Sequence, residues 1–104
     1  MLDTSDRQVF NSSYDASLGT VGFEAVITDM VSAVLSFDKR RRQLFLLNGG
    51  DKIVYVGLTL DVSPDIFSIK LLPKGVLTIS DYGGLITAIC DPGNTSNLYV
   101  TDIH

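Results

Sequence analysis

The chain has 104 residues, of which 45% are hydrophobic and 19% are charged, and its formal net charge at pH 7 is −4. This composition is too apolar for a disordered chain, too interrupted by polar residues for a membrane span, and too acidic for a general nucleic-acid binder, whose affinity comes from Lys and Arg. We therefore expect one water-soluble domain that binds neither nucleic acid nor membrane, and its single cysteine excludes an internal disulfide.

Residues 1–19 differ in composition from the remainder of the chain. They are rich in Ser, Asp and Asn, and their few apolar residues follow no helical or strand period. We predict an extended N-terminal arm that orders against a neighbouring subunit, with Val9, Phe10 and Tyr14 as its contacts. The first residues lack the basic start and apolar run of a secretory signal, which indicates synthesis in a cytoplasm.

Residues 20–104 are expected to form the folded domain. Short apolar runs, rich in β-branched and aromatic residues, are broken by turn-forming residues about every eight to twelve positions. This spacing predicts an all-β fold, either an antiparallel β-sandwich or a jelly-roll-like barrel of about eight short strands. A short helix within Val21–Phe37 is the alternative for the first two runs. The predicted strands are Val21–Thr28, Val31–Phe37, Gln43–Asn48, Lys52–Gly57, Ile66–Leu71, Val76–Ser80, Leu85–Cys90 and Leu98–Ile103.

A basic run follows the second predicted strand. It holds half of the chain's 8 Lys and Arg residues, at Lys39, Arg40, Arg41 and Arg42. One interpretation is solvated charge that protects a sheet edge, and exposed charge pairs usually contribute little to stability. The other is a contact with an acidic partner, because Arg pairs with carboxylates through two hydrogen bonds.

Two turns are expected to close β-hairpins. At Asn48-Gly49-Gly50-Asp51, two glycines can take positive φ without steric cost, so the flanking strands are predicted to fold back on each other. At Pro73-Lys74-Gly75, proline fixes φ and glycine closes the turn between Ile69–Leu71 and Val76–Ile79.

The strand Ile53–Val56 is apolar on both faces, since neither of its alternating sets of side chains is polar. Strands of this kind are covered on both sides. In a domain this small we expect the second cover to come from another subunit or from the arm, which favours an oligomer.

Candidate catalytic residues are poorly placed. The single histidine, His104, is the last residue, where chains usually fray, and a Ser-His-Asp triad needs a histidine held between two partners. Cys90 ends an apolar strand and is expected to be a buried, inert thiol. We therefore predict that the protein is not an enzyme and carries no cofactor.

Loop aspartates and tyrosines also have structural explanations. The spacing of Asp61, Asp65, Asp81 and Asp91 does not match a calcium-binding loop, and Asp is favoured in turns by its local hydrogen bonds. A carbohydrate platform would commonly use Trp, which the chain lacks, so packed or rim positions are expected for Tyr55, Tyr82 and Tyr99.

Four stretches resemble segments of small β-sandwich proteins from tailed-bacteriophage virions. They are the leucine-rich strand, Asn-Gly turn and Ile-Tyr-Val-Gly strand of Arg42–Gly57, followed by Ile69–Gly75, Tyr82–Ile89 and Gly93–Thr101. The resemblance implies a virion component without a catalytic motif: a capsid cement or decoration protein, or a part of the neck, tail or fibre.

The functional expectation is accordingly a cement protein, assembled in the host cytoplasm and located in the virion. It would form a homotrimer and bridge major capsid subunits, with the arm and the basic run meeting the capsid. The alternative is a neck, tail or fibre component that binds a receptor or glycan through the loops Thr59–Asp65 and Asp91–Asn97.

Overall fold

The computed structural model describes residues 19–104, which form strands and connecting turns without a helix. The first two apolar runs are therefore strands, and the alternative helix within Val21–Phe37 is wrong. The predicted arm residues Val9, Phe10 and Tyr14 lie outside the described part of the chain. The strands are β2 (Thr20–Ile27), β3 (Ser32–Leu35), β4 (Gln43–Asn48), β5 (Val54–Gly57), β6 (Ile69–Leu71), β7 (Val76–Ser80), β8 (Ile86–Cys90) and β9 (Ser96–Ile103).

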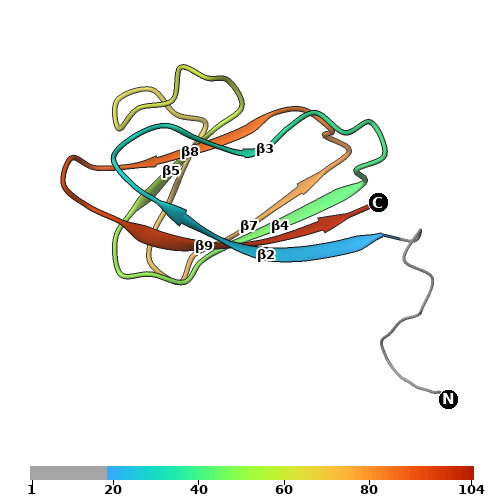
Figure 1. Ribbon diagram of the computed structural model, residues 1–104, viewed down its shortest axis with the longest axis horizontal. Coiled ribbons are helices and arrows are strands. Elements are labelled where there is room, and N and C mark those ends of the chain that lie inside the picture. Colours follow the sequence, from blue (N-terminus) through green and yellow to red (C-terminus); the bar gives the residue numbers. More distant parts are fainter. Residues whose placement is uncertain (1–18) are drawn as a thin grey trace, which may run out of the picture.

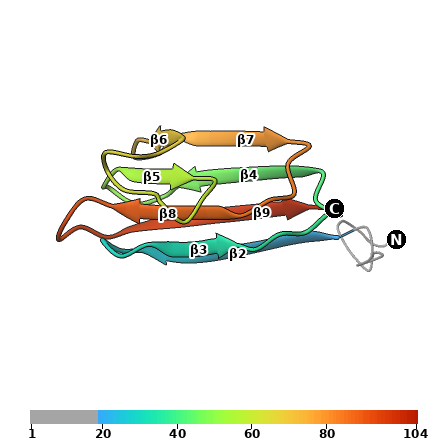
Figure 2. The ribbon, with the colours of Figure 1, turned by 90° about the horizontal axis from the view of Figure 1, so that it is seen from above.

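The strands form two stacked antiparallel sheets, with the orders β2-β9-β4-β7 and β3-β8-β5-β6. Consecutive strands mostly alternate between the sheets, so that β8 and β9, or β4 and β5, lie one above the other (Figures 1 and 2). In one sheet β2 pairs with β9, and in the other sheet β3 pairs with β8. Together with the positions of β4 to β7, this is the strand order of a jelly roll. The predicted all-β sandwich is confirmed.

Both predicted hairpins are wrong. β4 pairs with β7 and β9, whereas β5 pairs with β6 and β8, so the turn at Asn48–Asp51 joins two sheets. The buried side chain of Asn48 explains this crossing, because its amide donates to the carbonyls of Lys52 (2.7 Å) and Leu71 (2.9 Å). The turn after β6 also crosses, to β7 in the other sheet.

The turn residues serve a different purpose from the one expected. Neither Gly49 nor Gly50 has positive φ; a side chain at Gly49 would instead collide with the Tyr99 ring, and one at Gly50 with Ser96. Glycine is needed there because the turn packs closely against β9. In the other turn, the left-handed residue is Lys74, with φ of 66°.

The core lies between the two sheets. Alternate residues of most strands point into it, and each of these side chains is at most 4% exposed: Ile27, Leu44, Leu46, Val54, Val56, Leu71, Ile86, Ala88, Cys90, Leu98 and Val100. Burying a side chain of the size of Leu or Ile stabilises the fold by about 1.5–3 kcal/mol. The expected burial of Cys90 is confirmed, and desolvation raises the pKa of its thiol.

The strand β5 is buried on both faces, as predicted, but its second cover comes from this chain. Tyr55 points away from the core and forms a separate apolar cluster with Val62 and Ile89. The ring of Phe67 also contacts Tyr55, with ring centroids 5.1 Å apart. Residues 58–68 thus supply the cover that we expected from another subunit or the arm, and β5 no longer argues for an oligomer.

Candidate functional site

The sheet β2-β9-β4-β7 presents a nearly uncharged surface, which we call the outer face. Side chains alternate along each strand, so those between the core residues of β9 and β4 point outward. The strand register aligns them in three rows: Glu24, Tyr99, Leu47 and Val76; then Gly22, Thr101, Phe45 and Thr78; then Thr20, Ile103, Gln43 and Ser80. Of these, only Glu24 carries a charge, and its carboxylate accepts a hydrogen bond from the Asn97 amide.

Three of the four side chains in the first row are apolar and solvent-exposed. Tyr99, Leu47 and Val76 are cross-strand neighbours, and 43%, 38% and 66% of their surfaces are exposed. Contiguous apolar groups on a soluble domain are typical of protein-binding surfaces, in which charged residues are depleted at the centre. The outer face has this composition.

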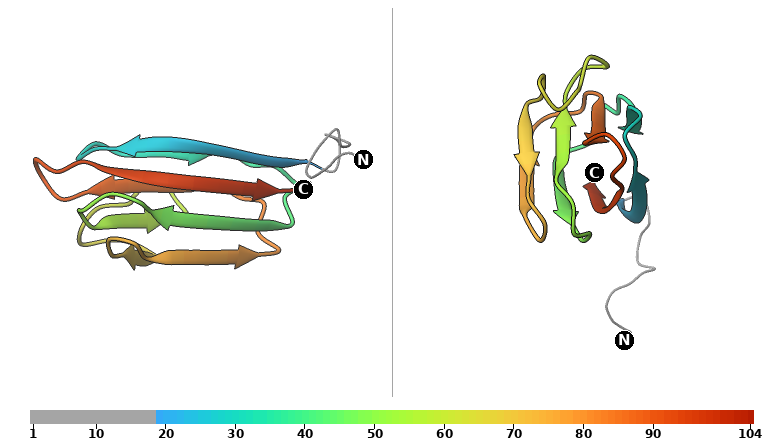
Figure 3. Two further views of the ribbon diagram at one scale, coloured as in Figure 1. Left: turned by 90° about the horizontal axis from the view of Figure 1, so that it is seen from below. Right: turned by 90° about the vertical axis from the view of Figure 1, so that its left-hand side faces the viewer.

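The opposite side of the sandwich is covered. Residues 58–68 lie over the sheet β3-β8-β5-β6 (Figure 3), where Val62 is 4% exposed and the Thr87 hydroxyl donates to the Thr59 carbonyl at 2.6 Å. The predicted recognition loop Thr59–Asp65 is thus part of this cover. Among the described residues, the two sheets therefore differ: the central strands β5 and β8 of one sheet are covered by the chain itself, and the outer surface of the other sheet is bare.

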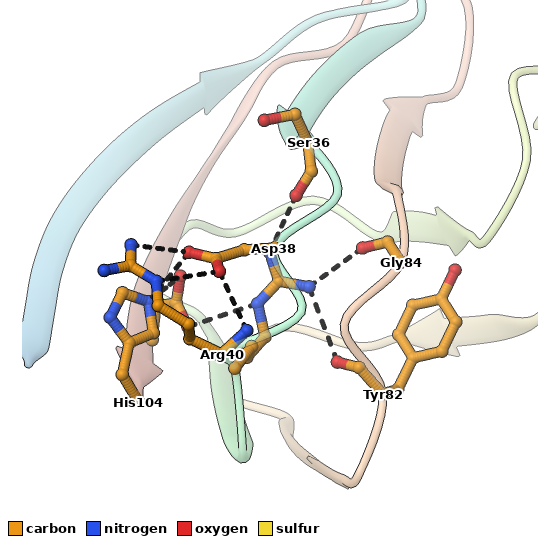
Figure 4. Close-up of polar contacts among 8 residues, drawn as sticks. Ser36, Asp38, Arg40, Tyr82, Gly84 and His104 are labelled. Carbon is orange, nitrogen blue, oxygen red and sulfur yellow. Dashed lines mark hydrogen bonds and ion pairs between the residues drawn. The ribbon is translucent and has the colours of Figure 1, made fainter.

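Arg41 is the centre of a buried polar cluster at one end of the sandwich. Figure 4 shows the surroundings of this cluster, with Ser36, Tyr82 and Gly84 labelled. Its side chain is 1% exposed, and Nε donates to Asp102 Oδ1 at 3.1 Å. Its other nitrogens donate to the carbonyls of Gly84 and Ser36, each at 2.8 Å. Arg41 thus ties β9 to the connections after β3 and β7, and the expectation that it contacts a partner from the surface is wrong.

Sequence reasoning overlooked this role because four basic residues in a row resemble a solvated turn. A signal was present in β9, where Leu98, Val100 and Asp102 alternate on one face. A carboxylate on the apolar face of a strand needs a buried cation or donor. Its partner lies 61 residues away, and the spacing of residues did not identify it.

Asp38 and His104 lie beside the Arg41 pair. The Asp38 carboxylate accepts from Nε and Nη2 of Arg40, both at 3.2 Å, and this interaction lowers the pKa of Asp38 to about 2. His104 Nε2 lies 3.3 Å from Asp38 and 3.5 Å from Asp102, and the His104 side chain is 14% exposed. Both groups near His104 Nε2 are carboxylates. In a catalytic triad this nitrogen would face the hydroxyl or thiol of the nucleophile, so these three residues do not have the composition of a triad.

The remaining basic residues are exposed at the same end of the molecule. Arg40 has 71% of its side chain exposed despite its pairing with Asp38, and Lys39 and Arg42 are exposed too. Arg42 adjoins Gln43 of the outer face, and its backbone N–H donates to Ile103 at 2.7 Å. Arg42 therefore lies next to the outer face, and the three exposed side chains remain candidates for partner contact.

Tyr55 and Tyr82 occupy packed positions, as expected, whereas Tyr99 does not. Tyr55 is buried, Tyr82 is half-buried and donates to the Leu85 carbonyl at 2.9 Å, and Tyr99 is exposed on the outer face. Because Tyr55 and Tyr99 lie on opposite sides of the sandwich, they do not form one stacking platform. The loop Asp91–Asn97 joins β8 to β9, where Gly93 N–H donates to Asp29 at 2.8 Å.

Residues 19–104 contain no group of three His, Cys, Asp or Glu side chains arranged to hold a metal ion. In the same residues, no helix has the length and apolar character needed to cross a membrane. Comparison of the chain with models of known families, with curated proteins and with solved structures gave no match.

Proposed function

We propose that this chain is a structural protein of a virus particle, a capsid cement or decoration protein whose outer face binds neighbouring major capsid subunits. The observation that carries the proposal is the bare, nearly uncharged outer face with its three exposed apolar side chains, on a molecule whose opposite sheet has its central strands covered. The resemblance to phage virion proteins supplies the partner class.

The chemistry of the outer face favours a protein partner. A nucleic acid would be held through Lys and Arg contacts to phosphates, and the outer face contains none. Small molecules generally bind in concave sites, whereas this surface is the side of a sheet. A second protein can cover such a sheet with matching apolar side chains, and hydroxyls such as those of Thr78 and Thr101 can form hydrogen bonds beside them.

The exposed basic side chains Lys39, Arg40 and Arg42 extend this contact at one end. They would meet acidic groups of the capsid subunit, where rim charges mainly set the orientation and the rate of association. The proposed contacts of Val9, Phe10 and Tyr14 belong to the segment that precedes β2 in the chain. Arg41 has no part in this contact because its guanidinium is enclosed by Asp102 and backbone carbonyls.

Binding of this kind stabilises a shell by mass action. A protein that binds the assembled lattice and not the free subunits shifts the assembly equilibrium toward the shell. The jelly-roll order is consistent with this role because it is used by viral capsid domains, although lectins and other proteins use it too.

The proposal is tested with particles that lack the chain. Purified protein is added to them and its binding is measured by co-sedimentation. Thr101→Lys places a charge in the central row of the outer face and is expected to abolish binding, because that charge would be buried without a partner. Thr95→Lys, in the exposed turn before β9, adds the same charge away from the outer face and is the matched control.

Circular dichroism should show that both variants keep the wild-type fold. Wild-type binding by a folded Thr101→Lys variant, or failure of the wild-type chain to bind particles, contradicts the proposal.

The second candidate is a neck, tail or fibre component that recognises a receptor. It is favoured by two apolar side chains in the connection after β5, Leu60 and Ile66, which are 65% and 62% exposed. Copy number separates the two roles, because closed symmetric assemblies fix stoichiometry. A capsid role predicts on the order of hundreds of copies per particle, and a neck or tail role about a dozen or fewer.

A further inference from the structure

The edge strand β2 lacks the features that normally protect a sheet edge. It runs for eight residues without a register shift, contains no proline, and has Glu24 as its single charged residue. The other edges are blunted: β3 is four residues long with a register shift, and β6 is three residues long and contains Lys70. A long, regular edge with a single charge is a site for pairing with another strand.

β7, the fourth edge, is five residues long and bounded by Lys74 and Asp81, whose φ values are positive. Its inward residues Leu77 and Ile79 are packed against the core. β7 is therefore shorter than β2 and its inward side chains are packed, and it serves below as the control edge.

Among residues 19–104, β2 pairs on one side only, with β9, and the backbone groups on its other side have no partner. The Gly19 carbonyl accepts from the His104 N–H at 2.8 Å, on the side of β9. Because residues of an antiparallel strand point their N–H and C=O groups alternately to the two sides, every second residue from Val21 to Ile27 also bonds to β9. The backbone groups of Thr20, Gly22, Glu24 and Val26 therefore point away from the sheet.

Two apolar side chains of β2 face the interior without being covered. Val21 and Phe23 share a strand face with the core residue Ile27, yet 49% and 38% of their surfaces are exposed. The cause is visible in Figure 2, where β2 continues past the end of β3 in the facing sheet. An additional strand beside β2 would cover both side chains.

We propose that β2 pairs antiparallel with β2 of a second copy of this chain, so that the sheets of two copies join into one. The two-fold axis passes by Phe23, which then lies opposite its counterpart. In this register Gly22 faces Glu24 and Thr20 faces Val26, so all four residues with free backbone groups are paired in each copy. On the inner side, Val21 lies beside Ala25 of the other copy, and the two Phe23 rings cover each other.

The neighbouring registers are less favourable. Centring the pair on Glu24 would place two carboxylates directly opposite each other, which destabilises a sheet. Centring it on Gly22 would pair Val26 with a residue before the strand begins. Of these three registers, the one centred on Phe23 pairs the whole edge with itself, as the isologous contact of a two-fold dimer requires. A dimer is predicted here, where the sequence had led us to expect a trimer.

Proline substitution tests the pairing. Gly22→Pro removes an N–H that points away from the sheet, and proline is tolerated at such edge positions. It removes two hydrogen bonds from each dimer and is expected to raise the dissociation constant on the order of 30-fold. Thr78→Pro is the matched control: it lies in the same cross-strand row, on β7, and its N–H also points away from its sheet.

The measurement is analytical ultracentrifugation of the full chain over a range of concentrations, with circular dichroism to confirm that the variants fold. The proposal predicts a wild-type dimer that Gly22→Pro weakens and Thr78→Pro leaves intact. A monomeric wild-type chain at millimolar concentration, a dimer weakened equally by both variants, or a dimer lost in Thr101→Lys overturns it. Thr101→Lys changes the outer face and not the β2 edge, so failure of the edge pairing is distinct from failure of the proposed function.

Discussion

Replacing Arg41 with Met tests whether the buried polar cluster holds the end of the sandwich together. The substitution keeps an unbranched apolar side chain and removes the guanidinium. Asp102, 8% exposed, then loses its cation, and the carbonyls of Ser36 and Gly84 lose their donor. Removing one partner of a buried ion pair costs about 3–5 kcal/mol, which is a large part of the roughly 5–15 kcal/mol that stabilises a domain.

Two further variants show how much of the stability lost in Arg41→Met comes from the unpaired charge of Asp102. Arg40→Met removes the neighbouring guanidinium, which is 71% exposed and pairs with Asp38, so we expect only a small change in the free energy of unfolding. The double variant Arg41→Met/Asp102→Leu removes both buried charges and leaves mainly the two carbonyls unpaired, at about 1 kcal/mol each or somewhat more. It should therefore be more stable than Arg41→Met alone.

Urea denaturation followed by circular dichroism gives the free energy of unfolding of each variant. Equal loss in Arg40→Met and Arg41→Met, or an Arg41→Met variant within about 1 kcal/mol of the wild type, would refute the view that Arg41 is a structural element rather than part of the exposed basic run.

Three more predictions concern pH, the thiol and a turn. The pKa of Asp38 in the folded chain is about 2, below its ordinary value of 3.8, so its favourable interaction with Arg40 is complete above about pH 4 and is lost as the pH falls toward 2. The difference in melting temperature between the wild type and Asp38→Asn should therefore shrink over that interval; a constant difference would contradict this. Cys90 should react with a thiol reagent only after unfolding, since it is fully buried and its thiol pKa is raised; rapid labelling of the native protein would count against the packing. Gly50→Ala should destabilise the fold by about 1–3 kcal/mol in thermal denaturation, because its Cβ would collide with Ser96. Gly22→Ala is the control, where the nearest atom is 3.8 Å from the new Cβ, and an equal loss there would disprove the close contact at Gly50.

The strands were well predicted because each one is marked by a run of apolar residues that lie next to one another in the sequence. Two predicted runs, Gln43–Asn48 and Val76–Ser80, match β4 and β7 at both ends. It misassigned the turns because a glycine-rich turn shows that the chain reverses, not which sheet the next strand joins. The contact that decides this, from Asn48 to the Leu71 carbonyl, joins residues that are 23 positions apart.

The candidate surface was not predictable in the same way. Its rows exist because β9 pairs with both β2 and β4, which aligns Tyr99 with Leu47 and Glu24. No local pattern gives that register. The basic run was recognised, but separating Arg41 from its exposed neighbours required knowing that its side chain meets Asp102. The two-sided burial of β5 was predictable from its composition, whereas the identity of its cover was not.

The most direct test of the proposed function is the position of this chain in an imaged virus particle. Electron cryomicroscopy should show on the order of hundreds of copies on the shell, each with the outer face of β2-β9-β4-β7 against major capsid subunits and residues 58–68 on the other side. Particles without the chain, or copies whose outer face is open to solvent while another surface makes the contacts, would contradict the proposal.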